Sequence, residues 1–315
     1  MRQQINNMKK NILIGTRGST LAMWQAEWVK KKIEENNSFV HVYIVKIKTT
    51  GDQIVDRPLA MVGGKGLFVK EIEKKLLDKK IDLAVHSMKD MPGELPPGLI
   101  IGAIPLRENP FDVLISKEGL KLYDLPAEAK IGTSSLRRAS QIKHARPDFI
   151  TKSIRGNLHT RLKKLAAGDF DAIILAAAGI IRLGMEDKIT QYLDETIMLP
   201  AVGQGALCIE SRDNDKKTAS LLKALNHNDT NIIVTGERAF LKRLQGSCHI
   251  PVACFGKLDN TTLILTGLVA SENGEQIIKK TLKKDINYAE QAGIDLADII
   301  LSMGGRKILE NLEIQ

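Results

Sequence analysis

The chain has 315 residues, 43% hydrophobic and 26% charged, with a net charge of +9. This length exceeds one ordinary domain, and the composition is that of a globular rather than a disordered protein. The longest apolar run, residues 172–181, is far shorter than the roughly 18 residues that a membrane-spanning helix needs, and the N-terminus has no secretory apolar core. We therefore expect a cytoplasmic protein that does not enter a membrane.

Cysteine and histidine spacing points away from disulfides and metals. The three cysteines, Cys208, Cys248 and Cys254, form no CxxC pair, and no His or Cys spacing suits a tetrahedral metal site. The lysine doublets fall on polar faces of predicted helices without interleaved aromatic residues, so we do not expect nucleic-acid binding. We therefore expect reduced thiols and no metal. Cationic side chains in predicted turns, rather than the lysine doublets, are the candidates for ligand binding.

The first hundred residues alternate predicted strands and helices. A strand at 12–14 leads through a Gly-Thr-Arg-Gly-Ser turn into a helix with two apolar rows, which both look like core: Leu21, Trp24, Trp28, and Ala22, Ala26, Val29, Ile33. A strand at 40–48 is apolar on both faces. A Gly-rich loop at 50–66 then precedes a helix with Phe68, Ile72 and Leu76, and a strand at 81–85.

The pattern restarts near residue 112 and repeats the strand, turn and helix scheme. The shared "IGT" at 14–16 and 131–133 indicates two similar α/β domains, and after 199–212 we expect the chain to return to the first sheet. Later strands joined by Asn273-Gly274 predict a hairpin in a small α+β third domain. The predicted boundaries are 1–105 with 200–222, then 106–199, then 223–315.

Polar residues follow the predicted strand in "LAVHSMKDMP" at 83–92. In open α/β sheets, ligands bind outside the carboxyl ends of the strands, so these side chains lie where chemistry is usually done. Neither "VGGKGLF" nor "GQGALC" completes a nucleotide-binding motif, because required glycine and hydroxyl positions are missing.

Arginines and hydroxyls recur at predicted helix starts, where backbone N–H groups and guanidinium forks can bind carboxylates. They form three groups: Arg17 with Ser19; Thr133, Ser134 and Ser135 with Arg137 and Arg138; and Arg155 with Arg161. At any one site, simple N-capping beside a surface arginine is an alternative. Three such sites in two similar domains favour an interdomain cleft for a ligand with several carboxylates.

Seven motifs together resemble one enzyme family: "IGTRGSTLAMWQA", "GGKGLFVKEIE", "DLAVHSMKDMP", "IGTSSLRRASQI", "IRGNLHTRLKKL", "LPAVGQGALCIE" and "GSCHIPVACFG". In order from about residue 11 to 256, they are similar to porphobilinogen deaminase, also called hydroxymethylbilane synthase. That family joins four porphobilinogen units head to tail with loss of ammonia, on a dipyrromethane cofactor held by a cysteine thioether. The resemblance implies two doubly wound, periplasmic-binding-protein-like α/β domains with an interdomain cleft, and a small α+β third domain.

The resemblance also implies residue roles. Asp90 would be catalytic, although pairing with Lys89 or capping of the turn is an alternative, and His86 would shape the turn. Cys248 would carry the cofactor covalently, with Asp90 and these residues binding it: Ser87, Lys89, Lys65, Thr133, Ser134, Ser135, Arg137 and Arg138. The substrate-binding set would be Arg17, Ser19, Gln25, Phe68, Arg155, Arg161, Arg182 and Gln204, with Arg182 alternatively a helix-end cation.

Two departures and one rival function accompany this resemblance. Met61 stands where many relatives place a lysine, and Ser247 and His249 flank Cys248 where glycine and glutamine are commoner. A two-domain protein that binds an anionic ligand without catalysis would show the same helix starts, but would need neither Asp90 nor Cys248. For the enzyme we expect a monomer with porphobilinogen as its small-molecule partner.

Overall fold

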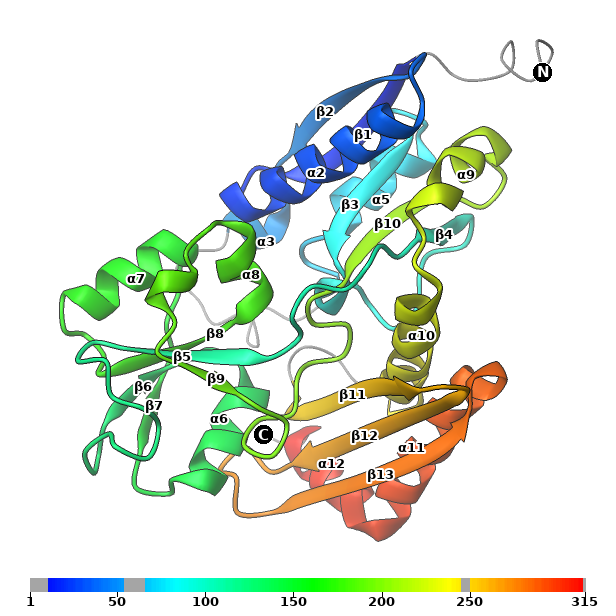
Figure 1. The fold of residues 1–315 in the computed structure, drawn as a ribbon. Helices are drawn as coiled ribbons and strands as arrows, with labels where there is room; N and C mark the ends of the chain where they lie inside the picture. The colour runs from blue at the N-terminus through cyan, green and yellow to red at the C-terminus, as the bar shows by residue number, and fades with distance from the viewer. Residues whose placement is uncertain (1–10, 54–65, 245–249, 314–315) are drawn as a thin grey trace. The chain divides into compact units, whose positions relative to one another are not determined.

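The computed structural model describes residues 11–53, 66–244 and 250–313, and the chain forms two compact units (Figure 1). Unit 1 comprises residues 1–107 and 206–231, and unit 2 comprises residues 108–205 and 232–315. The three predicted domain boundaries stay a prediction. Within the described ranges, no helix has both the length and the apolar character needed to cross a membrane.

Unit 1 is built on a five-stranded sheet with the order β2-β1-β3-β10-β4. β1 runs parallel to β2 and β3, whereas β10 runs antiparallel to β3 and β4. The return of β10 to this sheet confirms the predicted crossing of the chain. The strands are β1 (Asn11–Arg17), β2 (His41–Ile47), β3 (Leu83–Ser87), β4 (Leu99–Ala103) and β10 (Leu207–Arg212).

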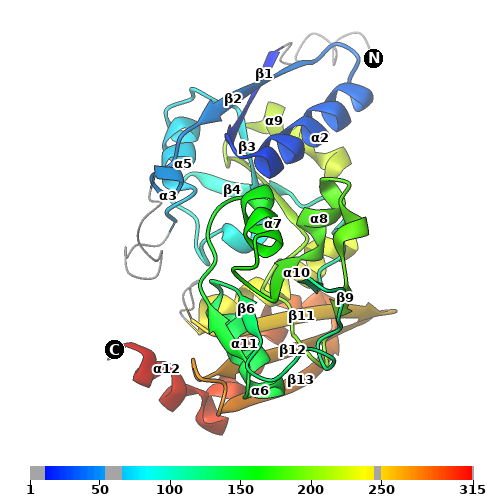
Figure 2. The ribbon, with the colours of Figure 1, turned by 90° about the vertical axis from the view of Figure 1, so that its left-hand side faces the viewer.

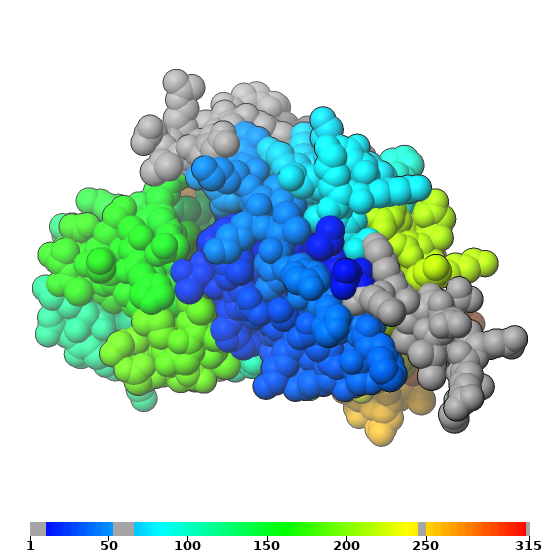
Figure 3. Space-filling view, turned by 90° about the horizontal axis from the view of Figure 1, so that it is seen from above, coloured from blue at the N-terminus to red at the C-terminus, as the bar shows by residue number. Residues whose placement is uncertain are grey.

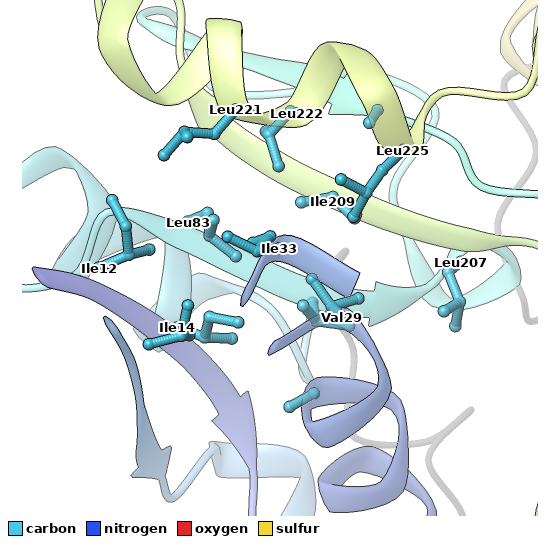
Figure 4. Packing of buried hydrophobic residues seen from close by; sticks show 14 of the residues in the cluster. Ile12, Ile14, Val29, Ile33, Leu83, Leu207, Ile209, Leu221, Leu222 and Leu225 are labelled. Atoms are coloured by element: carbon cyan, nitrogen blue, oxygen red, sulfur yellow. The ribbon is translucent and has the colours of Figure 1, made fainter. Parts of the chain in front are cut away.

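Helices cover both faces of this sheet, with α2 (Thr20–Asn36) and α5 (Lys70–Leu77) on opposite sides (Figure 2). On the α2 side, Val29 and Ile33 pack with Ile12, Leu83 and Ile209 (Figure 4). The row containing Ala22, Ala26, Val29 and Ile33 is buried, but Leu21, Trp24 and Trp28 are only half-buried, because the sheet covers one side of the helix. The remaining helical segments are α3 (Thr50–Gln53), the 3₁₀ turn η1 (Met88–Asp90), α9 (Lys216–Leu222) and η3 (Lys223–Leu225).

On the α5 side, Ile72 and Leu76 pack against Ile47, Ile81 and Ala84. Because alternate residues of a strand face opposite sides, Leu83 and Val85 belong to the α2 side while Ala84 belongs to the α5 side. Figure 3 shows the yellow-green segment that contains α9 beside the cyan segment of unit 1, and α9 contacts β4. Unit 1 is therefore one α/β layer structure assembled from two parts of the chain.

Unit 2 contains a second mixed sheet with the order β7-β6-β8-β5-β9. Strand β6 lies between parallel neighbours β7 and β8, as β1 lies between β2 and β3, so the prediction of two similar α/β sheets is confirmed. The strands are β5 (Asp112–Ser116), β6 (Lys130–Gly132), β7 (Ile150–Lys152), β8 (Ala172–Ala176) and β9 (Gln191–Leu193). The helical segments are α6 (Leu136–Ala145), α7 (Leu158–Ala166), α8 (Ala177–Arg182) and η2 (Glu186–Lys188).

A third, antiparallel sheet in unit 2 has the order β11-β12-β13, and its core includes Phe240, Leu263 and Leu296. Asn273 and Gly274 connect β12 to β13, and Gly274 has a φ of +74°, which confirms the predicted hairpin. The strands are β11 (Val252–Asp259), β12 (Thr262–Ala270) and β13 (Ile277–Asp285). The helical segments are α10 (Asn228–Arg243), whose first four residues belong to unit 1, η4 (Ile286–Tyr288), α11 (Ala289–Ile300), the π-helical η5 (Leu301–Gly305) and α12 (Arg306–Glu313).

Candidate functional site

A pocket in unit 1 lies at the carboxyl ends of the parallel strands β1 and β3. Arg17 ends β1, Ser19 begins α2, and Ser87 ends β3, and all three line this pocket together with Asp90. The strand ends meet here because β1 and β3 run in the same direction. Predicted site residues from two segments of the chain, 17–19 and 87–90, are thus brought together.

The turn that carries Asp90 is held by contacts with two other elements. Gln25 Nε2 donates a hydrogen bond to Ser87 Oγ at 2.9 Å, and Met88 N donates to Ala206 O at 3.0 Å. The short 3₁₀ turn then brings half-buried Asp90 to the pocket lining, while Met88 points into the core. Gln25 is buried and also contributes to the lining of the pocket.

Arg17 is engaged by two side chains of unit 1. Its guanidinium pairs with Asp52, and it stacks on the Phe68 ring with 4.0 Å between Cζ and the ring centroid. Burial alone would raise the pKa of Asp52, but hydrogen bonds from Arg17 and Thr49 together hold that pKa below its usual value. Asp52 was not singled out from the sequence, because nothing local links it to an arginine 35 residues earlier.

Two consecutive arginines of α6 share one buried carboxylate in unit 2. Arg137 Nη1 lies 2.7 Å from Asp112 Oδ2, and Arg138 Nε donates to Asp112 Oδ1 at 2.8 Å. Gln204 Nε2 also donates to Asp112 Oδ1, at 3.1 Å, and to Pro110 O, at 2.7 Å. Asp112 was missed by sequence reasoning, although a carboxylate in the strand "DVLIS" signals a buried charge that needs partners.

Arg138, Arg155 and Arg161 form a group of mutually repelling cations. Arg161 Nε donates to Gly156 O at 2.9 Å in front of α7, whose N-cap Asn157 accepts a hydrogen bond from Thr160 N. Burial, and after it the charges of Arg138 and Arg155, lower the pKa of Arg161 to about 10. Like charges held together in a partly buried place favour binding of an anion.

The hydroxyl residues that precede α6 have different environments. Ser134 Oγ donates to Ile154 O at 2.7 Å, and Thr133 Oγ1 accepts from Ser135 N at 3.2 Å. Ser135 is the N-cap of α6 but makes no capping hydrogen bond with its side chain. Ser134 and Thr133 therefore order the helix start.

Arg182 ends α8 and is buried, and its Nη2 donates to Gly205 O at 2.7 Å. Burial lowers the pKa of Arg182 to about 10, with the charge of Glu108 acting in the opposite direction. Lys89 lies half-buried in η1. Cys208 and Cys254 are buried, while Lys65, Met61 and Cys248 lie outside the described residues.

Unit 1 carries a carboxylate in a pocket at its strand ends, and unit 2 carries neighbouring guanidinium groups near its helix starts, so the chain is an α/β protein with charged groups gathered at these places. Residues 12–220 match the family model "Porphobilinogen deaminase, dipyromethane cofactor binding domain", and residues 232–302 match "Porphobilinogen deaminase, C-terminal domain". The chain belongs to the porphobilinogen deaminase family, which confirms the predicted resemblance.

Curated relatives match nearly the whole chain. Porphobilinogen deaminase of Desulforamulus reducens is 47% identical, covering 97% of this chain and 99% of the relative. That of Syntrophotalea carbinolica is 50% identical, covering 96% of each. A solved TRAP periplasmic solute binding protein from Desulfovibrio salexigens has a TM-score of 0.43 at 10% identity, covering 70% of this chain and 73% of that one.

The family's cofactor, dipyrromethane, has a donor set to match it in this chain. Its pyrrole rings bear acidic arms, and Arg137 and Arg138 share the single carboxylate of Asp112, so this pair keeps a net positive charge. Ser135 adds a hydroxyl at the start of α6. The residues present therefore fit the cofactor.

Proposed function

We propose that this chain is a transferase, a hydroxymethylbilane synthase, which joins four porphobilinogen units head to tail, releases ammonia and forms the linear tetrapyrrole hydroxymethylbilane. Membership of the porphobilinogen deaminase family supports this reaction. The observation that carries the assignment of chemistry is the position of Asp90, which lines the pocket with Arg17, Ser19 and Ser87.

Asp90 acts on a substrate that becomes cationic. The carboxyl group of Asp90 gives a proton to the leaving amine, and the bond between the methylene carbon and nitrogen then breaks to release ammonia. The resulting carboxylate stabilises the positive charge spread over the pyrrole ring. When the new carbon–carbon bond has formed, the same carboxylate takes the proton that the attacked ring carbon loses.

The arginines hold the carboxylate arms. We assign Arg155, Arg161 and Arg182 to substrate, with Arg17 and Ser19 at the unit 1 pocket, and Arg137 and Arg138 to the cofactor. Because Asp112 and Gln204 orient both guanidinium groups while neutralising only one charge, the pair keeps a net positive charge for an acidic ligand. Phe68 keeps Arg17 in place by stacking.

Cys248 is assigned as the attachment point, with Ser87, Lys89, Lys65, Thr133, Ser134 and Ser135 as further cofactor contacts. When bound, dipyrromethane supplies the pyrrole ring to which the first substrate is joined. A thiol suits this attachment because sulfur is strongly nucleophilic. Cys208 and Cys254 are buried in strands and are not assigned to it.

We also assign the protein to the cytoplasm, as a monomer without a nucleic-acid partner. The support is that the three cysteines form no CxxC pair, and that basic charge is gathered at sites suited to a small acidic ligand. Sedimentation of the purified protein checks the monomer.

Intact mass spectrometry tests the proposed function. The purified protein should carry a covalent adduct beyond the mass of the bare chain, and brief exposure to porphobilinogen should add further pyrrole units in steps. The bare chain mass under both conditions would contradict catalysis and favour an anion-binding protein that performs no reaction.

A further inference from the structure

Three ionisable side chains lie buried together behind the turn that carries Asp90. His86 of β3 and Glu210 of β10 are both buried, and His86 Nε2 lies 3.1 Å from Glu210 Oε2. Glu73 of α5 is buried as well. None of the three residues has a role in the chemistry proposed above, where His86 only shapes the turn.

The sheet register places His86 and Glu210 on one face. In the antiparallel pair, His86 lies opposite Cys208 and Ala84 lies opposite Glu210, so His86 and Glu210 are diagonal neighbours two positions apart. Ala84 packs in the cluster that contains Ile72 and Leu76, so this face is the one covered by α5. Glu73 lies one residue after Ile72 on that helix and is likewise buried.

Both carboxyl groups have one oxygen that lacks a hydrogen-bond partner. These atoms are Glu73 Oε1 and Glu210 Oε1. Two buried carboxylates near each other are costly when both are ionised, whereas one neutral acid beside one carboxylate is not. Burial and, after it, the charge of Glu210 raise the pKa of Glu73 to about 7, while exposed Lys70 acts in the opposite direction.

The other charged side chain of β10 on this face has partners elsewhere. Arg212 Nη1 donates to Leu76 O at 2.9 Å and to Ile81 O at 2.7 Å, and its Nη2 lies 2.7 Å from Asp215 Oδ2. Glu210 thus faces His86 from β3, Glu73 from α5, and Arg212 two residues along its own strand. Because Arg212 is engaged elsewhere, a proton bound to Glu73 is what relieves the repulsion between the carboxylates of Glu73 and Glu210.

We infer that Glu73, in its neutral form, keeps Glu210 as the carboxylate partner of His86, and that this relay positions the Asp90 turn. The inference rests on the proposed role of Asp90. His86 directly precedes Ser87, and η1 ends at Asp90, so an anchor at His86 limits the movement of the segment that presents the catalytic carboxylate. Glu73 and Glu210 lie outside the lining of the Asp90 pocket and His86 is part of it, and we assign all three residues a positioning role.

The same substitution at the two glutamates gives opposite outcomes. Glu73→Gln copies a neutral acid, so the holoenzyme should keep kcat within about twofold. Glu210→Gln removes the negative charge that holds His86, so kcat should fall about tenfold to a hundredfold while KM changes little. Ile72→Val is the matched control, because it loosens the same helix without changing a charge and should leave kcat near wild type.

Nuclear magnetic resonance of ¹⁵N-histidine-labelled holoenzyme supplies a readout besides activity. The His86 ring should keep its proton on Nε2 in wild type and in Glu73→Gln, and should lose this preference in Glu210→Gln. As pH rises through about 7, wild-type His86 should shift with ionisation of Glu73, and Glu73→Gln should lack that shift. If Glu210→Gln does not fold, His86→Gln, which retains an N–H donor, should keep more kcat than His86→Leu.

Equal loss of kcat in Glu73→Gln and Glu210→Gln, or a His86 spectrum unaffected by either, would overturn the relay. Asp90→Asn is measured beside them. Normal turnover in Asp90→Asn would refute the proposed function itself, whereas the His86 spectra would still decide whether Glu73 controls the Glu210 contact.

Discussion

Gln25 Nε2 donates a hydrogen bond to Ser87 Oγ at 2.9 Å, and this contact ties α2 to the end of β3 directly before the turn that contains Asp90. The bond joins residues 62 positions apart, and Gln25 is buried. A catalytic group on a short turn needs such support, because small displacements of a reacting group reduce rates strongly. The position of Asp90 is thus a property of the folded unit rather than of its local sequence.

Asp90→Asn should lower the rate of ammonia release about a hundredfold to a thousandfold, because it removes a preorganised charge and a proton carrier while nearly keeping the side-chain volume. Asp90→Glu keeps the charge on a longer stem and should retain more activity. Single-turnover ammonia release is measured beside thermal unfolding, which should be near wild type in both. Wild-type release by Asp90→Asn would mean that Asp90 only caps its turn.

Arg161→Ala should impair elongation more than folding. The lowered pKa of Arg161 reflects its burial beside Arg138 and Arg155, so removing this side chain relieves repulsion in the protein without ligand. The acidic ligand, however, loses a charged hydrogen bond worth about 1.5 to 3 kcal/mol. Unfolding in urea and the distribution of pyrrole adducts by mass spectrometry provide the comparison. Arg243→Ala, which breaks an exposed pair with Asp298, is the control.

Arg155→Ala should also impair elongation, whereas Arg138→Ala should additionally destabilise unit 2. Arg138 is buried and bonds to Asp112, and removing one partner of a buried ion pair costs about 3 to 5 kcal/mol when no other partner remains. Arg137 still pairs with Asp112, so the loss should be smaller. Normal turnover together with easy unfolding in both variants would make these arginines structural.

Cys248→Ser should give a folded protein whose intact mass lacks the cofactor and whose activity is almost absent. Cys208→Ser and Cys254→Ala should retain the adduct, because both thiols are buried in strands. A normal adduct on Cys248→Ser would move the attachment to another residue.

Glu73→Gln should change how stability depends on pH. The raised pKa of Glu73 means that the folded protein holds a proton that the unfolded chain releases between about pH 4.5 and 7. The stability that this bound proton contributes is complete below about pH 4.5 and is lost as pH rises through about 7. The free energy of unfolding falls by up to roughly 3 kcal/mol over this range. Urea unfolding is measured at pH 5 and pH 8.5. Relative to wild type, the free energy of unfolding of Glu73→Gln should be higher at pH 8.5 than at pH 5, whereas that of Ile72→Val should differ by the same amount at both. A pH-independent difference for Glu73→Gln would contradict the raised pKa.

The sequence by itself determined the alternation of strands and helices, the return of the chain at β10 and the Asn273-Gly274 hairpin, because periodicity, glycine conformations and turn chemistry act over a few residues. Its long motifs also identified the family. The helix around Phe68 was predicted too early, since α5 begins at Lys70 and Phe68 instead stacks on Arg17. That contact depends on a residue 51 positions away.

Only the tertiary structure decided which charges meet. Asp112 binds Arg137 and Arg138, Asp52 binds Arg17, and Glu73 faces Glu210 because strands and helices distant in the chain are packed together. Electrostatic interactions and desolvation depend on distance in space and on burial, and neither is encoded in the spacing of a single segment. The sequence therefore identifies the residue types that the chemistry requires, while the fold determines their partners and protonation states.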